Sequence, residues 1–215
     1  MLKALMMMPR QSGANLGMIN VDAVILAAGR SSRMGVASKA LLPLNDLPLL
    51  DHVIKRLAPQ VDSLIVSGDQ ILLDNLDYPV IEDVTAKFSG PLAGLYSALV
   101  SSHLSDAEYL MVVPCDGPLA PETLVAALYR VIRAADADVA CVRYDGVVQG
   151  TFSLWHKRQV DRIKNALLVE KYGGFKPLMR ALDTVYLDWP EQSVNPFFNI
   201  NTPDDLKKAE KLLYV

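Results

Sequence analysis

Two kinds of apolar pattern alternate along the sequence, and this alternation constrains the fold more than any other feature. Short apolar runs, typical of strands covered on both faces, occur at 22–27, 64–67, 80–81 and 109–113, with less clear ones at 139–143 and 152–155. Between these runs, apolar residues recur at helical spacing in 49–57, 92–100 and 124–132. This alternation predicts an α/β fold with a Rossmann-like, doubly wound, mainly parallel sheet flanked by helices.

A last helix is predicted from its end signals rather than from its apolar spacing. Thr202 is suited to cap its N-terminus and Pro203 to occupy its first position. Asp204 and Asp205 then face the positive end of the helix dipole, and three lysines follow near the negative end. Helical structure is therefore expected from Pro203 onwards.

Composition limits the class of protein. The 215 residues are 51% hydrophobic, 21% charged and carry a net charge of −3, which argues against disorder and against a general nucleic-acid binder. No run of 18 apolar residues occurs, so no membrane contact is expected. Two cysteines fit a reducing, cytoplasmic setting. We expect a single domain over 21–215 and a flexible extension over 1–20, where Pro9 and Arg10 interrupt a short apolar stretch.

The loop that follows the first predicted strand carries the strongest functional signal. In doubly wound sheets, ligands bind beyond the carboxyl ends of the strands. Gly29 and Gly35 can adopt positive φ, and Arg33 and Lys39 add cationic donors. Backbone amides, a guanidinium and a point charge are what a triphosphate requires. Neither the P-loop nor the dinucleotide motif is present. The alternative interpretation, a surface loop whose Arg and Lys side chains only face water, is equally compatible with these residues.

Four separated motifs carry a resemblance to a known family. They are Leu26–Gly29 with Arg33–Gly35 and Lys39, then Glu82–Asp83 with Gly90–Gly94, then Pro114–Pro118, and then Asn199–Asp204. The first motif resembles nucleotidyltransferases of the molybdenum-cofactor and sugar-nucleotide type, and the later ones are similar to molybdenum cofactor guanylyltransferases of the MobA type. The sequence departs from the family at Ala28, where a second glycine is common, and at Ser38, where an acidic residue is common.

The resemblance implies a nucleotidyltransferase fold and a reaction. The family transfers GMP from GTP to the terminal phosphate of molybdopterin, forming molybdopterin guanine dinucleotide and pyrophosphate, with Mg²⁺ as the metal. It implies GTP and molybdopterin as partners, together with molybdenum-insertion proteins or molybdoenzyme chaperones. Alternatives are a molybdopterin cytidylyltransferase, favoured by Ala28, or a sugar-1-phosphate nucleotidylyltransferase. A non-catalytic nucleotide-binding accessory domain is a further alternative, supported by the Ser38 departure.

Three residues are the predicted catalytic groups. Asp116 follows the apolar run at 109–113, which places its carboxylate at the rim of the expected crevice. Mg²⁺ binds one or two carboxylates together with phosphate oxygens and water, so Asp116 alone suffices as its protein ligand. Arg33 and Lys39 would hold the triphosphate, because phosphoryl transfer depends on placement and electrostatics. Asp116 is also the residue at which the resemblance implies metal and nucleotide binding.

Further residues are assigned to the two substrates. Asp83 and Asp69 both follow predicted strands, and a carboxylate accepts two hydrogen bonds from guanine N1–H and its amine. A solvated loop aspartate is the alternative for each. The resemblance assigns Asn199 and Asn201 to molybdopterin. The predicted nucleotide-binding residues are Leu26, Ala27, Ala28, Gly29, Gly35, Lys39, Asp69, Asp83, Gly90 and Asp116.

Overall fold

The computed structural model describes residues 19–28, 38–84 and 90–212, and it contains a seven-stranded sheet with strand order β5-β4-β1-β6-β8-β7-β9. Pairs β5–β4, β4–β1, β1–β6 and β7–β9 are parallel, whereas β8 runs antiparallel to β6 and β7. The predicted mainly parallel sheet is therefore confirmed. The strands are β1 Val21–Leu26, β4 Leu64–Ser67, β5 Val80–Ile81, β6 Tyr109–Pro114, β7 Val139–Tyr144, β8 Val147–His156 and β9 Thr184–Asp188.

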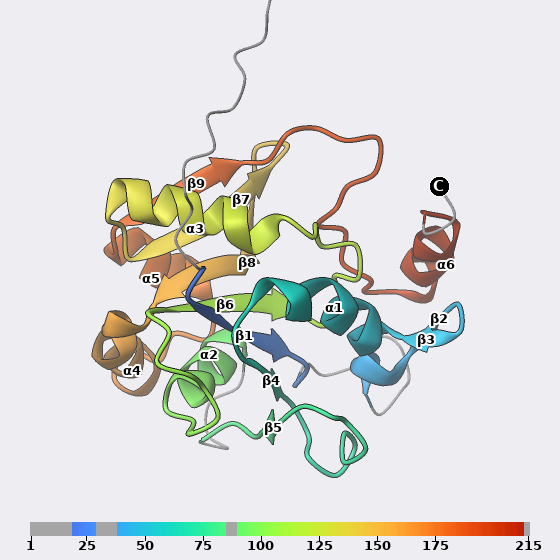
Figure 1. Cartoon of the computed structure of the whole chain (residues 1–215), viewed down its shortest axis with the longest axis horizontal. Helices are drawn as coiled ribbons and strands as arrows, with labels where there is room; N and C mark the ends of the chain where they lie inside the picture. Colours follow the sequence, from blue (N-terminus) through green and yellow to red (C-terminus); the bar gives the residue numbers. More distant parts are fainter. Residues whose placement is uncertain (1–18, 29–37, 85–89, 213–215) are drawn as a thin grey trace, which may run out of the picture.

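Helices cover both faces of this sheet, as a doubly wound fold requires (Figure 1). Helices α1 and α3 pack on one face, and α2, α4 and α5 pack on the other. Helix α6 packs against a small hairpin of β2, Pro43–Leu44, and β3, Leu47–Pro48. The helices are α1 Leu49–Leu57, α2 Pro91–Leu99, α3 Leu124–Ala135, α4 Val160–Leu168, α5 Phe175–Ala181 and α6 Pro203–Leu212.

Strand β1 shows why its sequence lacks polar alternation. Val21, Ala23 and Ile25 contribute to the core beneath α1 and α3, and Val24 contributes to the core beneath α2. Side chains alternate between the two faces of a strand, so a central strand needs apolar residues at consecutive positions. The apolar run thus follows from a central place in the sheet with helices on both sides.

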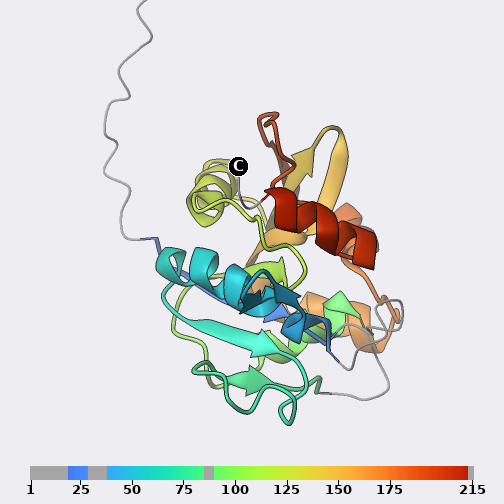
Figure 2. The same ribbon diagram turned by 90° about the vertical axis from the view of Figure 1, so that its right-hand side faces the viewer.

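The strand register aligns the carboxyl ends of three neighbouring strands. Leu26 of β1 pairs with Ser67 of β4 on one side and with Pro114 of β6 on the other. The segments that follow these residues leave the sheet at one edge, which is the edge where doubly wound folds bind ligands. Figure 2 looks toward this end of the molecule, where α6 and the β2–β3 hairpin lie.

The start of α6 brings a distant part of the sequence to the same edge. Thr202 Oγ1 accepts a hydrogen bond from the Asp205 amide at 3.2 Å and donates to the Asp205 carboxylate at 2.8 Å, so the predicted cap is confirmed. Ile200 is fully buried with Leu44, Leu49 and Ala209. Its amide donates to the Asp116 carbonyl at 2.9 Å. The segment before α6 is therefore attached to the end of β6.

The second half of the chain differs most from the sequence expectation. The apolar runs at 139–143 and 152–155 belong to a hairpin, and its second strand is ten residues long. Asp145 and Gly146 both have positive φ at its turn, which is the geometry that connects antiparallel strands tightly. Polar and apolar residues alternate irregularly in β8 because the register shifts between Cys141 and Val142. Helices α4 and α5, strand β9 and the β2–β3 hairpin were not predicted.

None of the helices in the described part of the chain is long and apolar enough to cross a membrane.

Candidate active site

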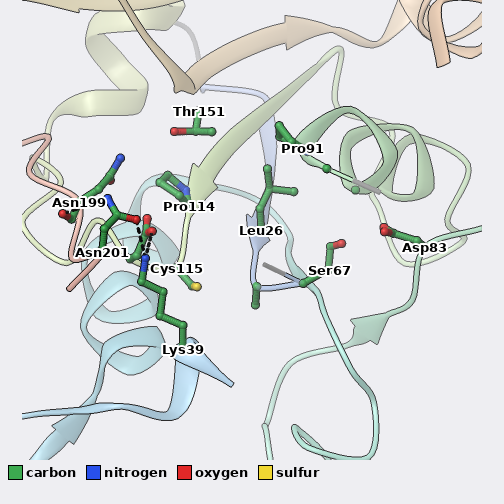
Figure 3. Close-up of a pocket in the computed structure, with 15 residues that line it drawn as sticks. Leu26, Lys39, Ser67, Asp83, Pro91, Pro114, Cys115, Thr151, Asn199 and Asn201 are labelled. Atoms are coloured by element: carbon green, nitrogen blue, oxygen red, sulfur yellow. Dashed lines mark hydrogen bonds and ion pairs between the residues drawn. The ribbon is translucent and has the colours of Figure 1, made fainter. Parts of the chain in front are cut away.

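A cavity of about 440 Å³ lies at the aligned carboxyl ends of β1, β4 and β6 (Figure 3). It receives residues from all three strands, from the start of α2 and from the segment before α6. Residues that are far apart in the sequence therefore share one site. The described lining residues are Leu26, Ala27, Ala28, Lys39, Ser67, Asp83, Gly90, Pro91, Gly94, Pro114, Cys115, Asp116, Thr151, Asn199 and Asn201.

One side of the cavity holds an ion pair between Lys39 and Asp116. Lys39 Nζ lies 2.5 Å from Asp116 Oδ2, and the two side chains are only 14% and 18% exposed. Lys39 Nζ also donates to Asn201 Oδ1 at 2.9 Å. The ammonium has three donors, and these two bonds leave one for a ligand. A phosphate in the cavity would thus meet a cation that the protein already holds in place.

Asp116 is fixed by the backbone on both sides of it. The Cys115 amide donates to the Leu26 carbonyl at 3.0 Å, which continues the β1–β6 pairing past the strand end. At Gly117, an added Cβ would lie 2.5 Å from the Phe152 ring, so this position requires glycine. Together with the bond from Ile200 to the Asp116 carbonyl, these contacts set the direction of the Asp116 side chain.

The opposite side of the cavity carries two polar oxygens without partners. Ser67 is fully buried, and its Oγ makes no hydrogen bond. Asp83 Oδ1 is also buried and unpartnered, and burial raises the pKa of this carboxyl above its usual value. Figure 3 shows Ser67 and Asp83 on one side, Lys39 and Asn201 on the other, and Leu26 between them. A buried polar atom without a partner is costly, which indicates that a ligand supplies the missing hydrogen bonds.

Two glycines of the predicted motif at Gly90–Gly94 have clear packing reasons. A Cβ at Gly94 would lie 2.7 Å from Leu26 Cδ2 and 2.9 Å from Ser67 Oγ. Gly90 has φ of 115° before α2, and a Cβ there would lie 2.6 Å from the Gly173 carbonyl oxygen. Without a side chain, Gly94 lets α2 pack closely against β1 and β4, and Gly90 lets the start of α2 lie directly against the Gly173 backbone.

A third orphaned atom also lies in the cavity lining. Asn199 Oδ1 is buried and has no hydrogen-bond partner. Among the described residues, four buried side-chain atoms lack a partner, and those of Ser67, Asp83 and Asn199 belong to lining residues. Their concentration at one cavity is the pattern expected of a binding site that takes a polar ligand.

The structure brings most of the predicted site residues together. The exception among the described residues is Asp69, which is not among those lining the cavity. Its Oδ1 accepts hydrogen bonds from the amides of Ile71 and Leu72 and so caps a turn. Gly29, Arg33 and Gly35 lie outside the described residues. The predicted residues that line the cavity are Leu26, Ala27, Ala28, Lys39, Asp83, Gly90, Asp116, Asn199 and Asn201.

The sequence analysis did not identify Ser67, which lines the cavity and carries one of its unpartnered oxygens. It is the last residue of a buried strand and is the neighbour of Leu26 in the sheet. The sequence did contain a signal, because Ser67 is a polar residue at the carboxyl end of an apolar run and is followed by Gly68 and Asp69. Asp69 carries the more conspicuous charge, but the chain has already turned away from the cavity there.

The other reactive side chains do not form a second centre. Burial, with the nearby Asp116 charge, raises the pKa of Cys115 to about 12, so its thiol is neutral at physiological pH and does not act as a nucleophile. No group of three or more His, Cys, Asp or Glu residues in the described ranges is placed to hold a metal ion. Among the described residues that line the cavity, Lys39 and Asp116 are the ion pair placed to act on an anionic ligand.

The charges in the cavity show what the described residues do not supply. Lys39 contributes +1, and Asp83 and Asp116 contribute −2, so these lining residues sum to −1. An anionic triphosphate needs further positive charge, which a divalent metal at Asp116 would provide. The segment between Ala28 and Ser38, which lies outside the described residues, contains Arg30 and Arg33. The fold and the cavity therefore define an α/β protein whose site suits a nucleotide.

The chain belongs to the MobA-like NTP transferase family, whose domain matches residues 23–185. A molybdenum cofactor guanylyltransferase of Rhodopseudomonas palustris (strain BisB5) is 35% identical over 194 residues, with 88% of this chain and 92% of the relative covered.

Two solved structures show the same fold. The Archaeoglobus fulgidus molybdopterin-guanine dinucleotide biosynthesis protein A superposes with a TM-score of 0.75 at 23% identity, covering 90% of this chain and 98% of the other. A Mycobacterium tuberculosis H37Rv protein in complex with manganese superposes with a TM-score of 0.60 at 20% identity, covering 89% and 98%.

Proposed function

We propose that this protein transfers GMP from GTP to the terminal phosphate of molybdopterin, forming molybdopterin guanine dinucleotide and pyrophosphate. The observation that carries the proposal is the Lys39–Asp116 pair facing the orphaned oxygens of Ser67 and Asp83 across one cavity. Guanylyltransferase relatives that share about a third of their residues over most of both chains support the choice of substrates.

The oxygen donors in the cavity fit Mg²⁺. Asp116 would hold the ion with its carboxylate, which lines the cavity. Mg²⁺ prefers oxygen ligands and commonly binds one carboxylate together with phosphates and water. When bound, Mg²⁺ would neutralise charge on the α-phosphate and on the departing pyrophosphate. Manganese, present in one structural neighbour, prefers the same kind of ligands.

The residues of the chain act mainly by placement and charge. Lys39 holds the triphosphate through its free donor, and Asp116 sets the position of the ammonium. An oxygen of the molybdopterin phosphate attacks the α-phosphorus of GTP, and the bond from that phosphorus to the bridging oxygen breaks. Pyrophosphate takes up the electron pair and leaves. The attacking phosphate is already ionised near neutral pH, so the protein needs no general base.

The orphaned oxygens match the edge of guanine. Asp83 would accept hydrogen bonds from N1–H and from the exocyclic amine, and the Ser67 hydroxyl would donate to O6. Cytosine does not present this pair of adjacent donors. Gly94 lets α2 pack directly against Leu26 and Ser67 on this side of the cavity, because a side chain there would collide with both. We assign the base to this side of the cavity and the triphosphate to the Lys39 side.

An Asp83→Asn variant is expected to lose about 10- to 100-fold of the preference for GTP over CTP, because one of two acceptors becomes a donor. Burial raises the pKa of Asp83, and only the ionised carboxylate accepts both bonds. In the wild type, GTP affinity should therefore hold above that raised pKa and fall as the pH drops through it. The variant should lack this acid limb. Nucleotide titrations across the pH range measure both effects.

The comparison residue for this test is Asp69, the other predicted base contact. Its carboxylate caps a turn, so Asp69→Asn is expected to leave the GTP-to-CTP ratio unchanged and to lower stability by about 1 kcal/mol at most. If Asp69→Asn shifts the ratio and Asp83→Asn does not, the base lies elsewhere than proposed.

Molybdopterin, the second substrate, would enter on the side of Asn199 and Thr151, which line the cavity away from Ser67.

We propose that residues 21–215 form one nucleotidyltransferase domain, since α6 packs on the β2–β3 hairpin of the first half. Free Cys115 and Cys141 fit action in a reducing cytoplasm. Proteins that insert molybdenum or receive the cofactor are the proposed protein partners.

Pyrophosphate release with purified molybdopterin, Mg²⁺ and either GTP or CTP tests the function. The proposal predicts turnover with GTP and little with CTP. Turnover with CTP alone would establish the cytidylyl alternative, and turnover with a sugar 1-phosphate in place of molybdopterin would establish the sugar-nucleotide alternative. Tight GTP binding without turnover would identify an accessory domain that no longer catalyses transfer.

A further inference from the structure

The two asparagines before α6 have different surroundings, although they lie two residues apart. Asn201 Oδ1 accepts a hydrogen bond from Lys39 Nζ at 2.9 Å, across 162 positions of sequence. Asn199 Oδ1 makes no hydrogen bond and is buried beside Gly117, where an added Cβ would lie 3.4 Å from it. Family resemblance assigns both to molybdopterin. The contacts instead connect Asn201 to the residue that holds the triphosphate.

We propose that Asn201 is a positioning residue for the nucleotide, acting through Lys39, and that Asn199 alone serves the acceptor. This inference rests on the proposed nucleotidyl transfer. The lysine side chain is flexible and has many rotamers, so two fixed acceptors are needed to set the direction of its third donor. Asp116 Oδ2 and Asn201 Oδ1 are those acceptors. Without Asn201, the ammonium can pivot about the single bond to Asp116.

Asn201 is itself held firmly enough for this role. Its amide donates to Asp205 Oδ2 at 3.1 Å, and its side-chain nitrogen donates to the Asn199 carbonyl at 3.4 Å. Asp205 Oδ2 also accepts from the Thr202 amide at 2.9 Å and from the Thr202 hydroxyl. Burial opposes ionisation of Asp205, but these hydrogen bonds outweigh it and lower its pKa, so the carboxylate stays charged. The cap of α6 thereby fixes the position of Asn201.

The test separates nucleotide binding from acceptor binding. We would measure the Kd of the α,β-methylene analogue of GTP, which cannot be cleaved at the reacting bond, and the KM of molybdopterin with GTP as donor. Asn201→Ala is expected to weaken analogue binding by roughly tenfold, the effect of a hydrogen bond to a charged group, and to leave the KM for molybdopterin unchanged. Asn199→Ala, the matched variant, should raise the KM for molybdopterin and leave analogue binding unchanged.

A double-mutant cycle tests whether Asn201 acts through Lys39. In a Lys39→Met background, Asn201→Ala should change analogue binding by less than about twofold, because the group that it positions is gone. Asp205→Ala should reproduce part of the Asn201→Ala loss when Lys39 is present. These variants affect exposed or partly exposed side chains, and thermal melting confirms that each is folded.

Three outcomes would overturn the inference: a changed molybdopterin KM with unchanged analogue binding in Asn201→Ala, equal changes in both constants, or a full tenfold effect that persists without Lys39. None of them depends on the choice of base. If the wild type turns over CTP instead of GTP, the proposed function fails, and the same cycle is run with the CTP analogue.

Discussion

Replacing Asp116 with alanine is expected to reduce pyrophosphate release by at least ~10³-fold, the upper range for loss of one preorganised electrostatic contact. Two roles would be lost together. The metal would lose its protein carboxylate, and Lys39 would keep only the hydrogen bond to Asn201. The fold should persist, because the Asp116 backbone, rather than its side chain, bonds to Ile200. Pyrophosphate release and thermal melting measure the two parts of this prediction.

The matched control for that experiment is Asp188→Asn. Asp188 also forms an ion pair, with Arg143, but it lies on β9 and is largely exposed. Surface pairs contribute roughly 0–1 kcal/mol to stability, so this variant should keep wild-type turnover. Near-normal turnover of Asp116→Ala, with the control also normal, would remove Asp116 from the mechanism.

Replacing Lys39 with methionine is expected to lower turnover by about 10²- to 10³-fold. Methionine keeps the apolar length of the side chain but removes the cation, so the described cavity lining changes from −1 to −2 and repels the triphosphate more strongly. The KM for GTP should rise and kcat should fall, because the lost charge serves both binding and the departing pyrophosphate. Steady-state kinetics with varied GTP measure this split.

Lys39→Arg is the informative companion to that variant. A guanidinium keeps the charge, but its planar, wider group does not fit between Asp116 Oδ2 and Asn201 Oδ1 as the ammonium does. We expect partial activity, between that of the wild type and of Lys39→Met. Because Lys39 and Asp116 act as a unit, the double variant should lose little more than either single one. Fully additive losses would show that the two residues act separately.

The sequence allowed the central part of the fold to be predicted because its strands are covered on both faces. Apolar runs located β1, β4 and β6, and helical spacing located α1, α2 and α3. The antiparallel β7–β8 hairpin was harder, since a bulge breaks the side-chain alternation of β8. The Asp145–Gly146 pair at its turn is nevertheless a typical hairpin signal in the sequence. Helices α4 and α5 are short and were not predicted.

The candidate site was predictable in its residues but not in its contacts. Motifs identified Lys39, Asp83, Asp116 and Asn201 as site residues, and the structure puts all four around one cavity. Which acceptor Lys39 uses depends on how α6 docks on the β2–β3 hairpin, and that depends on packing between distant segments. The same limit explains why Asp69 was assigned to the site and Ser67 was not, since only the packed structure shows that Ser67 lines the cavity.

Following the phosphorus atoms of GTP tests the central claim most directly. Purified protein, molybdopterin and Mg²⁺ would be incubated with GTP labelled at the α-phosphorus and, separately, at the γ-phosphorus. The account predicts the α label in a guanine dinucleotide of molybdopterin and the γ label in pyrophosphate. If the labels appear as GDP and inorganic phosphate, or remain in GTP, this cavity does not transfer a nucleotide.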